Sequence, residues 1–551
     1  MTAARVPTAI DAIAEDWVDR ELDLHPEARV MLGRAGREGE YGDYSPAGAE
    51  AYADAARQAL SRLREARAAD EVDEVTQRDL GRELELVLAR HEARLELRDL
   101  DVIASPAQCI REVFDLVPAE TEQDWSWIAE RMRRVGGAVD GYAETLRAGI
   151  DAGVVPALRQ VEGVMRQLEA QLAPEGFFRA FARQGAASHP RLARELAAGG
   201  EQADAAYGRL HAFLREELAP RASPVDAVGR EAYALASRGF LGAEIDLDET
   251  YEWGVAELAR MAAEQESIAR QIVPGASVAE AIAVLEQDPT RKLHGTEALR
   301  DWMQEVSDRA IAELGASHFD IPEPLTRLEC MIAPTQTGGI YYTPPSEDFA
   351  RPGRMWWSVP EGVTEFDTWR ELTTVYHEGV PGHHLQNGHA IHRSAVLNTW
   401  RRQHFVSGHG EGWALYAERL MAELGYLDDP ADRLGMLDGQ RLRALRVVLD
   451  IGVHLGKPRL DGTGVWDYEY ALGQMREHVH MPDPFLVFET NRYLGWPGQA
   501  PSYKIGQRIW EELREDARHR AGAEWDVKAW HSRALDLGGV GLDTLRWALS
   551  R

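Results

Sequence analysis

Hydrophobic and polar positions follow a helical period over most of the first 325 residues. Segments rich in Ala, Glu, Arg and Leu, such as AEAYADAARQALSRLREARAADEV, place apolar side chains three and four residues apart. Turn-forming stretches such as GREGEYGDYSP and ELAPRASPVD separate these segments. A heptad coiled coil is disfavoured because the apolar spacing is irregular and Pro and Gly interrupt it often. We therefore predict a helical bundle from Thr8 to about Leu325.

The pattern changes between about Leu328 and Trp357, where MIAPTQTGGIYYTPPSEDFARPGRMWWSVP contains short extended runs bounded by Gly, Pro and Thr. These runs predict a small β-sheet, and we expect ARPGRMWWS to form its edge strand, just before the next helix. The helical pattern resumes at FDTWRELTTVYHE and continues to the C-terminus, with loops predicted near Pro430, at 457–463 and at 481–501.

Together these patterns predict a mostly α-helical body with two lobes and a small sheet. We find neither an internal repeat nor a low-complexity linker, so we expect one continuous structural unit. Within it, residues 1–325 would form a mainly helical lobe and part of a cleft. Residues 326–551 would contain the sheet and the C-terminal helices.

Charge and composition exclude several classes of partner and site. The chain has 61 Lys and Arg against 91 Asp and Glu, a formal charge of -30, which argues against nucleic acid and anionic membranes as partners. The two cysteines, Cys109 and Cys330, support neither a disulfide framework nor a thiolate metal site. The acidic N-terminal stretch does not resemble a signal peptide and no apolar run is long enough to span a membrane, so we expect a cytoplasmic protein.

The stretch HEGVPGHHLQ, residues 377–386, begins like the zinc-binding motif H-E-x-x-H but has Pro381 where the second histidine should stand. A regular helix cannot pass through Pro381, because its ring clashes with the carbonyl four residues earlier. A straight helix would also separate His377 and His384 by roughly 10 Å along its axis. We therefore predict a bulge or break that brings His383 to the metal as second ligand, with His384 as the alternative.

The surrounding sequence supports the prediction of a metal site with nitrogen and oxygen ligands. Seven of the 18 histidines fall within 33 residues, from His377 to His409. In HGEGWALYAERLMAELGY, Glu411 and Glu418 are seven residues apart and share one helical face. We predict Glu411 as third ligand of one zinc ion, Glu418 as a partner of a ligating histidine, and Glu378 as general base. The competing interpretation is a solvated loop, since isolated His-Glu pairs are common.

Several segments together resemble a known family: HEGVPGHHLQ, HGEGWALYAE, LRVVLDIGVH, GWPGQAPSYKIGQ, VMLGRAGREGEYGDYSP and KLHGTEAL. They are similar to the large bacterial family called domain of unknown function 885 (DUF885). That family looks like a relative of the gluzincin peptidases, which include thimet oligopeptidase, carboxypeptidase Taq and angiotensin-converting enzyme. The resemblance runs through most of the chain. It implies a mostly helical, metallopeptidase-like fold with two lobes and zinc between them; the predicted sheet would lie next to the active-site helix. The two-residue insertion in the motif departs from the better-known relatives.

Two further segments contain candidates for stabilising an oxyanion. In LRVVLDIGVH, Arg446, Asp450 and His454 form a polar stripe at four-residue steps, which predicts either a satisfied core network or a cleft in which Asp450 orients His454 as a donor. In PSYKIGQ, Tyr503 lies just inside a predicted helix start, where a phenol could reach an oxyanion. The resemblance favours this role for Tyr503 over simple packing.

Substrate contacts are predicted from the aromatic and basic residues around the sheet and the C-terminal helices. An edge strand suits an extended peptide, and arginines or lysines could bind a carboxylate. The alternatives are core packing for the aromatic residues and ion pairs with the protein's own acids for the basic ones. The candidates are Tyr341, Tyr342, Arg354, Trp356, Arg492 and Lys504.

The sequence thus predicts a zinc-dependent hydrolase that cleaves short peptides, with carboxypeptidase-like action as the expected mode. A zinc amidase or esterase acting on non-peptide substrates would use the same residues. A helical binding protein with a degenerate metal site is the non-enzymatic alternative.

Overall fold

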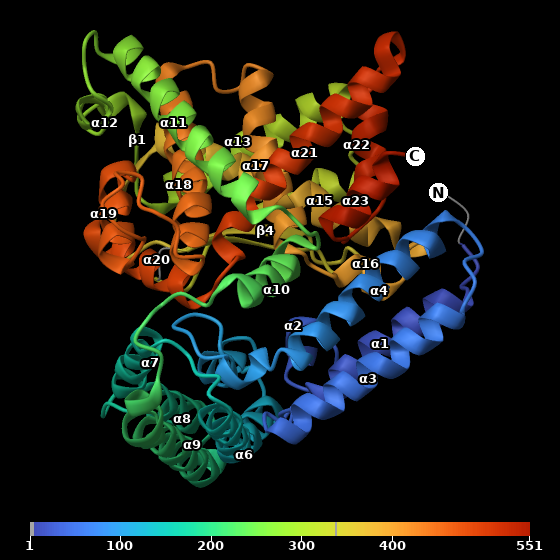
Figure 1. The fold of residues 1–551 in the computed structure, drawn as a ribbon, viewed down its shortest axis with the longest axis vertical. Helices are drawn as coiled ribbons and strands as arrows, with labels where there is room; N and C mark the ends of the chain where they lie inside the picture. Colours follow the sequence, from blue (N-terminus) through green and yellow to red (C-terminus); the bar gives the residue numbers. More distant parts are fainter. Residues whose placement is uncertain (1–4, 337–338) are drawn as a thin grey trace.

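The N-terminal lobe consists of nine α-helices in the computed structural model, which describes residues 5–336 and 339–551 (Figure 1). Its helices are α1 (Ala9–Leu24), α2 (Ala28–Met31), α3 (Pro46–Glu65), α4 (Glu71–Glu92), α5 (Pro106–Glu112), α6 (Glu122–Ala152), α7 (Leu158–Gln171), α8 (Phe177–Ser188) and α9 (Ala193–Phe213). A short 3-10 helix, η1 (Leu95–Arg98), follows α4. Figure 1 shows α1, α3 and α4 running obliquely beneath the rest of the molecule, with α6 to α9 gathered at one end.

The C-terminal lobe contains the remaining helices. They are α10 (Arg230–Leu241), α11 (Leu247–Ile272), α12 (Val278–Leu285), α13 (Thr296–Ser317), α14 (Thr368–Glu378), α15 (His383–His392), α16 (Thr399–Gln403), α17 (Ser407–Glu423), α18 (Pro430–His454), α19 (Tyr468–His478), α20 (Asp483–Gly495), α21 (Gln499–Ala521), α22 (Val527–Leu535) and α23 (Leu542–Leu549). None of the helices in the described ranges is long and apolar enough to cross a membrane.

Three hydrophobic clusters underlie the two lobes. One joins α5 to α9, a second joins α1, α3 and α4 with Trp400 of α16, and the third and largest extends over the C-terminal lobe. Helices α10 to α13 contribute to this third cluster together with α14, α17 and α18. Residue 325, where the sequence suggested a boundary between two regions, therefore lies within the core of the C-terminal lobe. The chain passes from the N-terminal to the C-terminal lobe near residues 222–229.

Local sequence signals explain where many helices begin. Thr8 caps α1 and Thr121 caps α6, each in a reciprocal pair with an aspartate three residues later. Helix α20 occupies much of the range 481–501 that was predicted as a loop, so that prediction is wrong for residues 483–495. Pro484 stands in the first turn of α20, where proline is tolerated because that N–H has no intrahelical partner.

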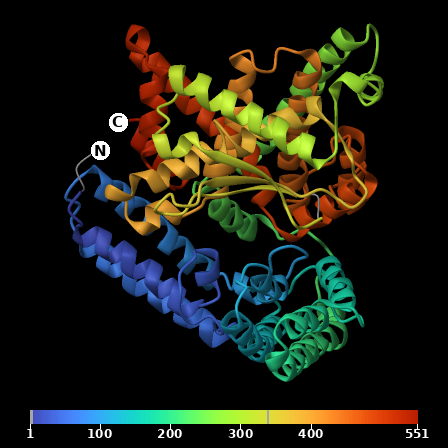
Figure 2. The ribbon, with the colours of Figure 1, turned by 180° about the vertical axis from the view of Figure 1, so that it is seen from behind.

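The predicted small sheet is present beside α14. Its strands β2 (Leu328–Ile332), β3 (Ile340–Thr343) and β4 (Gly353–Trp357) have the order β2-β4-β3. β4 is parallel to β2, with Leu328 opposite Gly353, and antiparallel to β3. The segment ARPGRMWWS is therefore the central strand and not the predicted edge, because the chain returns through the loop before it to insert β4 between the other two. Figure 2 shows the sheet on the side of the C-terminal lobe that is turned toward the N-terminal lobe.

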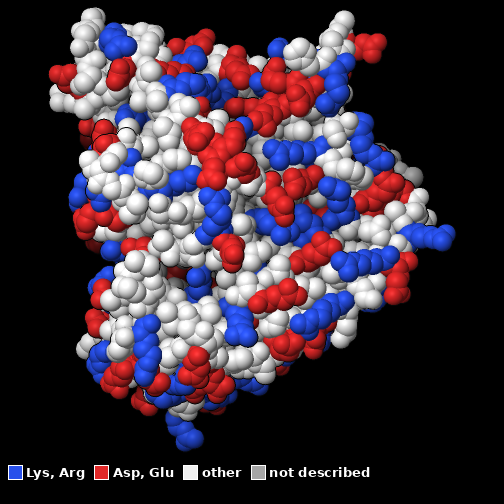
Figure 3. Space-filling view, in the orientation of Figure 1, with Lys and Arg blue, Asp and Glu red and all other residues white. Residues whose placement is uncertain are grey.

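A second, two-stranded sheet and a mixed surface complete the architecture. Strands β1 (Lys292–His294) and β5 (Glu365–Asp367) pair antiparallel, and β5 leads directly into α14. On the face shown in Figure 3, acidic and basic side chains are interspersed over both lobes. The mostly α-helical fold with a small sheet agrees with the prediction.

Candidate metal centre

The helix that carries the His-Glu pair ends at the interruption seen in the sequence. α14 ends at Glu378 and α15 begins at His383 after a four-residue loop, which confirms the predicted break at Pro381. The Pro381 carbonyl accepts a hydrogen bond of 2.8 Å from the Trp413 indole, which ties the loop to α17. As a result, the ring centroids of His377 and His383 lie 4.9 Å apart.

Three side chains meet at this loop in an arrangement that could hold a metal ion. The Nε2 atoms of His377 and His383 lie 3.3 and 3.6 Å from the same Glu411 oxygen, and one ligand atom from each residue lies within 4.8 Å of the others. Tetrahedral bonds of 2.0–2.2 Å place neighbouring ligand atoms about 3.3–3.6 Å apart. The two His–Glu distances match this spacing, so the donor set is compatible with a zinc ion.

His384 faces away from this cluster. Its Nδ1 lies 3.0 Å from the phenol oxygen of Tyr342, and its Nε2 lies 2.9 Å from the carbonyl oxygen of Leu325. A neutral ring satisfies both contacts, accepting from the phenol and donating to the carbonyl, and burial lowers the pKa of His384 to about 4. Both ring nitrogens are engaged, so the geometry favours His383 as the second ligand.

A chain of buried polar groups supports His377 from behind. Its Nδ1 donates to Glu418 Oε1 at 2.8 Å, the amide of Gln440 donates to Glu418 Oε2 at 3.2 Å, and Lys504 Nζ donates to Gln440 Oε1 at 2.8 Å. Lys504 is buried and also lies 3.1 Å from Glu257. Lys504 was predicted as a substrate contact, but it is instead part of this buried chain of polar groups. Glu418 occupies its predicted position beside a histidine.

The charges within the cluster interact strongly. Burial lowers the pKa of His377, but hydrogen bonds with Glu411 and Glu418 outweigh it and raise this pKa to about 10. Burial raises the pKa of Glu411, yet its hydrogen bonds to the two histidines hold it well below the usual range. The pKa of Glu378 is raised by burial, and its carboxylate accepts no hydrogen bond from any described residue. A carboxylate without a protein donor is available to a water molecule.

A cleft of about 1170 Å³ lies between the two lobes, and Glu411 connects the cluster to it. Glu411 and Tyr503 line it from the C-terminal lobe, and α3 and α4 line it from the N-terminal lobe. Tyr503 lies in the first turns of α21, as predicted, with the Arg446 guanidinium 5.1 Å from its ring centre. Burial raises the pKa of Tyr503 to about 12, so the phenol remains a hydrogen-bond donor near neutral pH.

Asp450 and His454 form a core network instead of facing the cleft. The Asp450 carboxylate accepts from the Tyr233 hydroxyl at 2.6 Å and from the Gly498 amide at 2.8 Å. His454 is fully buried, with Nε2 3.2 Å from the Tyr493 carbonyl oxygen, and burial lowers its pKa to about 4. The prediction that His454 donates a hydrogen bond to an oxyanion is therefore wrong, because its ring does not reach the cleft.

Most of the predicted substrate contacts also lie outside the cleft. Tyr341 stacks on Trp356, whose indole donates to a threonine on β3 at 2.9 Å. Tyr342 contacts His384, and Arg354 is paired with Glu329 at 2.8 Å. These side chains support the sheet, as the packing alternative predicted.

Arg492 does line the cleft, but its charge is compensated. Its guanidinium donates twice to Glu489, at 2.8 and 2.9 Å, and once to Gln499 at 2.7 Å. This leaves little capacity for a substrate carboxylate at Arg492.

The sequence did not indicate which other residues line the cleft. The apolar ones come from elements far apart in the chain: Tyr52, Leu86, Val87, Ile340, Phe405, Phe488 and Trp496. Charged side chains also line the cleft, among them Glu83, Arg90, His91 and Glu96. Phe405 and Phe488 are 55% and 44% exposed, and their place on the cleft wall depends on long-range packing that a sequence pattern does not show.

Comparison with known proteins agrees with the fold. No curated protein matches the chain. Two of the solved structures that match it are each described as a "putative lipoprotein". The one from Colwellia psychrerythraea has a TM-score of 0.86 and 22% sequence identity, with 99% of each chain covered. The one from Shewanella oneidensis, of unknown function, has a TM-score of 0.77 and 15% sequence identity, with 99% of this chain and 100% of that chain covered. The family model for "Bacterial protein of unknown function (DUF885)" matches residues 26–549. The chain therefore belongs to the DUF885 family.

Proposed function

We propose that the protein is a zinc-dependent hydrolase that cleaves peptide bonds in short peptides. The observation that carries the proposal is the cluster of His377, His383 and Glu411, whose ligand atoms lie within 4.8 Å of one another beside Glu378 and the interlobe cleft. Two imidazoles and one carboxylate are a donor set typical of catalytic zinc, which keeps a further position for water or substrate. When bound there, zinc would act as a Lewis acid toward a substrate carbonyl and lower the pKa of water.

The chain's own side chains would perform the proton transfers. The Glu378 carboxylate accepts the proton of the attacking water and then delivers it to the leaving amine. Its raised pKa suits the first step, because a carboxylate with a higher pKa binds the proton more readily. The Tyr503 phenol, held beneath the Arg446 guanidinium on the cleft wall, donates a hydrogen bond to the oxyanion that develops on the carbonyl.

The shape of the cleft supports short peptides as the substrate class. Its volume of about 1170 Å³ exceeds that of common small-molecule pockets, yet a lobe on either side restricts access by folded chains. Ile340, the first residue of edge strand β3, lines the cleft, so an extended peptide could pair with the main chain there. The apolar cleft residues would bind its side chains.

The proposal is tested by combining metal analysis with hydrolysis of a peptide library followed by mass spectrometry. We expect about one zinc ion per chain and cleavage of short peptides by the zinc-loaded protein. His377→Ala should lose both zinc and hydrolysis. His392→Ala, an exposed histidine on the same helix as His383, is the matched control and should lose neither.

Three outcomes would contradict the proposal. A protein that binds zinc but cleaves only non-peptide amides or esters would be a different metal hydrolase. A protein that binds no zinc and hydrolyses nothing after zinc is added would be a binding protein. Full zinc occupancy in His377→Ala would remove this cluster as the metal site.

A further inference from the structure

We propose that a side pocket next to the cleft binds the carboxyl-terminal residue of a short peptide, with the terminal carboxylate at Arg98. This inference rests on the proposed peptide hydrolase and adds to it the end of the substrate that is recognised.

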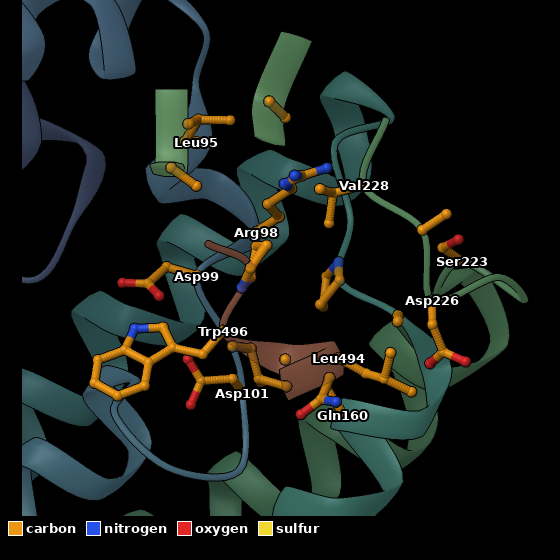
Figure 4. A pocket seen from close by; sticks show the side chains of 18 of the residues that line it. Leu95, Arg98, Asp99, Asp101, Gln160, Ser223, Asp226, Val228, Leu494 and Trp496 are labelled. Carbon is orange, nitrogen blue, oxygen red and sulfur yellow. The ribbon is translucent and has the colours of Figure 1, made fainter. Parts of the chain in front are cut away.

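The pocket lies where the two lobes join. It has a volume of about 150 Å³ and is formed by η1, the connection around 223–228, the first residues of α7 and the end of α20 (Figure 4). It shares Arg90, Leu95, Phe240 and Trp496 with the large cleft, so the two spaces adjoin. A peptide lying in the cleft could therefore place its terminal residue in the pocket.

Arg98 supplies an uncompensated positive charge there. Its half-buried guanidinium forms no hydrogen bond or ion pair with any residue in the described ranges. Burial lowers the pKa of Arg98, but an arginine remains protonated at neutral pH. Arg492 in the main cleft, by contrast, is saturated by Glu489 and Gln499. A ligand carboxylate at Arg98 would replace the hydration that burial has partly removed.

The carboxylates of the pocket do not neutralise Arg98. Asp226 pairs with Arg159 at 3.1 Å, and Asp101 Oδ1 accepts two backbone N–H groups at 2.7 Å. Figure 4 shows Arg98 toward one end of the pocket, near Val228, and Asp101 and Gln160 toward the other.

Two further charged groups lie at the boundary with the main cleft. Asp99 and Arg90 line both spaces, and burial raises the pKa of Asp99 to about 7. Neither side chain forms an ion pair in the described ranges, so Arg90 adds positive charge at the entrance, whereas Arg98 lines only the side pocket.

The rest of the wall suits an apolar side chain. Leu100, Val155, Val228 and Leu494 line the pocket together with the Trp496 ring. A space of about 150 Å³ accommodates a single residue but not a longer segment. We therefore expect an aliphatic C-terminal residue, such as leucine, with a free carboxylate.

The test measures binding separately from hydrolysis. Glu378→Gln serves as a non-hydrolysing protein, and calorimetry compares the peptide Ala-Ala-Ala-Leu as free acid and as C-terminal amide. The free acid should bind roughly ten- to a hundredfold more tightly, the range for a charge-assisted hydrogen-bonded contact. Adding Arg98→Gln should abolish this preference. Adding Arg166→Gln, an exposed arginine on α7, should preserve it.

Equal affinity for acid and amide in the Arg98-containing protein, or no binding of either at millimolar concentration, would overturn the inference. This comparison decides the matter even if Arg98→Gln fails to fold. A carboxylate preference that persists in a folded Arg98→Gln variant would also overturn it. If the zinc-loaded parent hydrolyses no peptide yet binds the acid preferentially through Arg98, the pocket stands and the hydrolase proposal fails. If it cleaves acid and amide equally and binds them equally, the hydrolase proposal stands and the pocket fails.

Discussion

Replacing Glu418 by glutamine should weaken zinc binding although Glu418 is not itself one of the three candidate ligands. Both of its oxygens act as acceptors, one from His377 and the other from Gln440. A glutamine at 418 can accept from His377 but then presents its NH₂ group to the NH₂ group of Gln440. Turning the Gln440 amide over would place that NH₂ group against the ammonium of Lys504. In either orientation of the Gln440 amide, the substitution therefore leaves two hydrogen-bond donors facing each other in a buried site.

The magnitude follows from the loss of this support. A buried polar group without its partner costs about 1–3 kcal/mol. Loss of the carboxylate that orients a ligating histidine usually lowers metal affinity 10–100-fold, which corresponds to about 1.4–2.7 kcal/mol. We therefore expect a rise in the zinc Kd of at least tenfold in Glu418→Gln, without loss of the fold.

The assay is competition for zinc against a chromophoric chelator, with circular dichroism to monitor folding. Glu423→Gln is the matched control, because Glu423 lies on the same helix and pairs with Arg514 at the surface. A surface pair of this kind contributes about 0–1 kcal/mol, and its loss should leave the zinc Kd unchanged. A zinc Kd in Glu418→Gln within twofold of the parent protein would refute the reasoning and exclude Glu418 as a support of the metal site.

Three other substitutions test separate parts of the site. Glu378→Gln should retain zinc and lower peptide hydrolysis by roughly 10²–10⁴-fold, because an amide cannot accept the proton of water; parental turnover would remove Glu378 from the mechanism. Tyr503→Phe should lower kcat by roughly 10²–10³-fold with little change in KM, and a pure KM effect would make the phenol a binding group. Gly353→Ala should lower the free energy of unfolding by about 1–3 kcal/mol and so lower Tm. A Cβ at this position would lie 2.3 Å from the Tyr342 hydroxyl and 2.6 Å from His384 Nδ1. An unchanged Tm would show that these side chains can move aside.

Local sequence signals predicted the elements around the candidate metal centre well. The proline in HEGVPGHHLQ forces the helix to break, and the spacing of Glu411 and Glu418 places both on one face of α17. Such features depend on neighbours within a few residues, so they can be recognised before the fold is known. The same holds for the small sheet, whose Gly, Pro and aromatic composition differs from the helices on either side.

Features that depend on long-range packing could not be predicted in this way. The strand order β2-β4-β3 requires knowing how the loop before Gly353 returns, and the sequence alone suggested an edge strand. Lys504 carries a positive charge in a segment next to Tyr503, yet its helix directs it into the interior toward Gln440. His454 similarly lies on a helix whose whole circumference is buried near that point, so helical periodicity could not indicate a cleft-facing side.

The two walls of the cleft belong to different packing units. Tyr52 and Val87 rest against the small cluster of α1, α3 and α4, whereas Trp413 and Tyr376, which surround the histidines, belong to the large cluster of the C-terminal lobe. Substitutions in separate cores act nearly independently on stability. Under the proposed function, substitutions in the N-terminal wall should therefore change the substrate preference while the histidine cluster keeps its geometry, so engineering of a new specificity would begin at that wall.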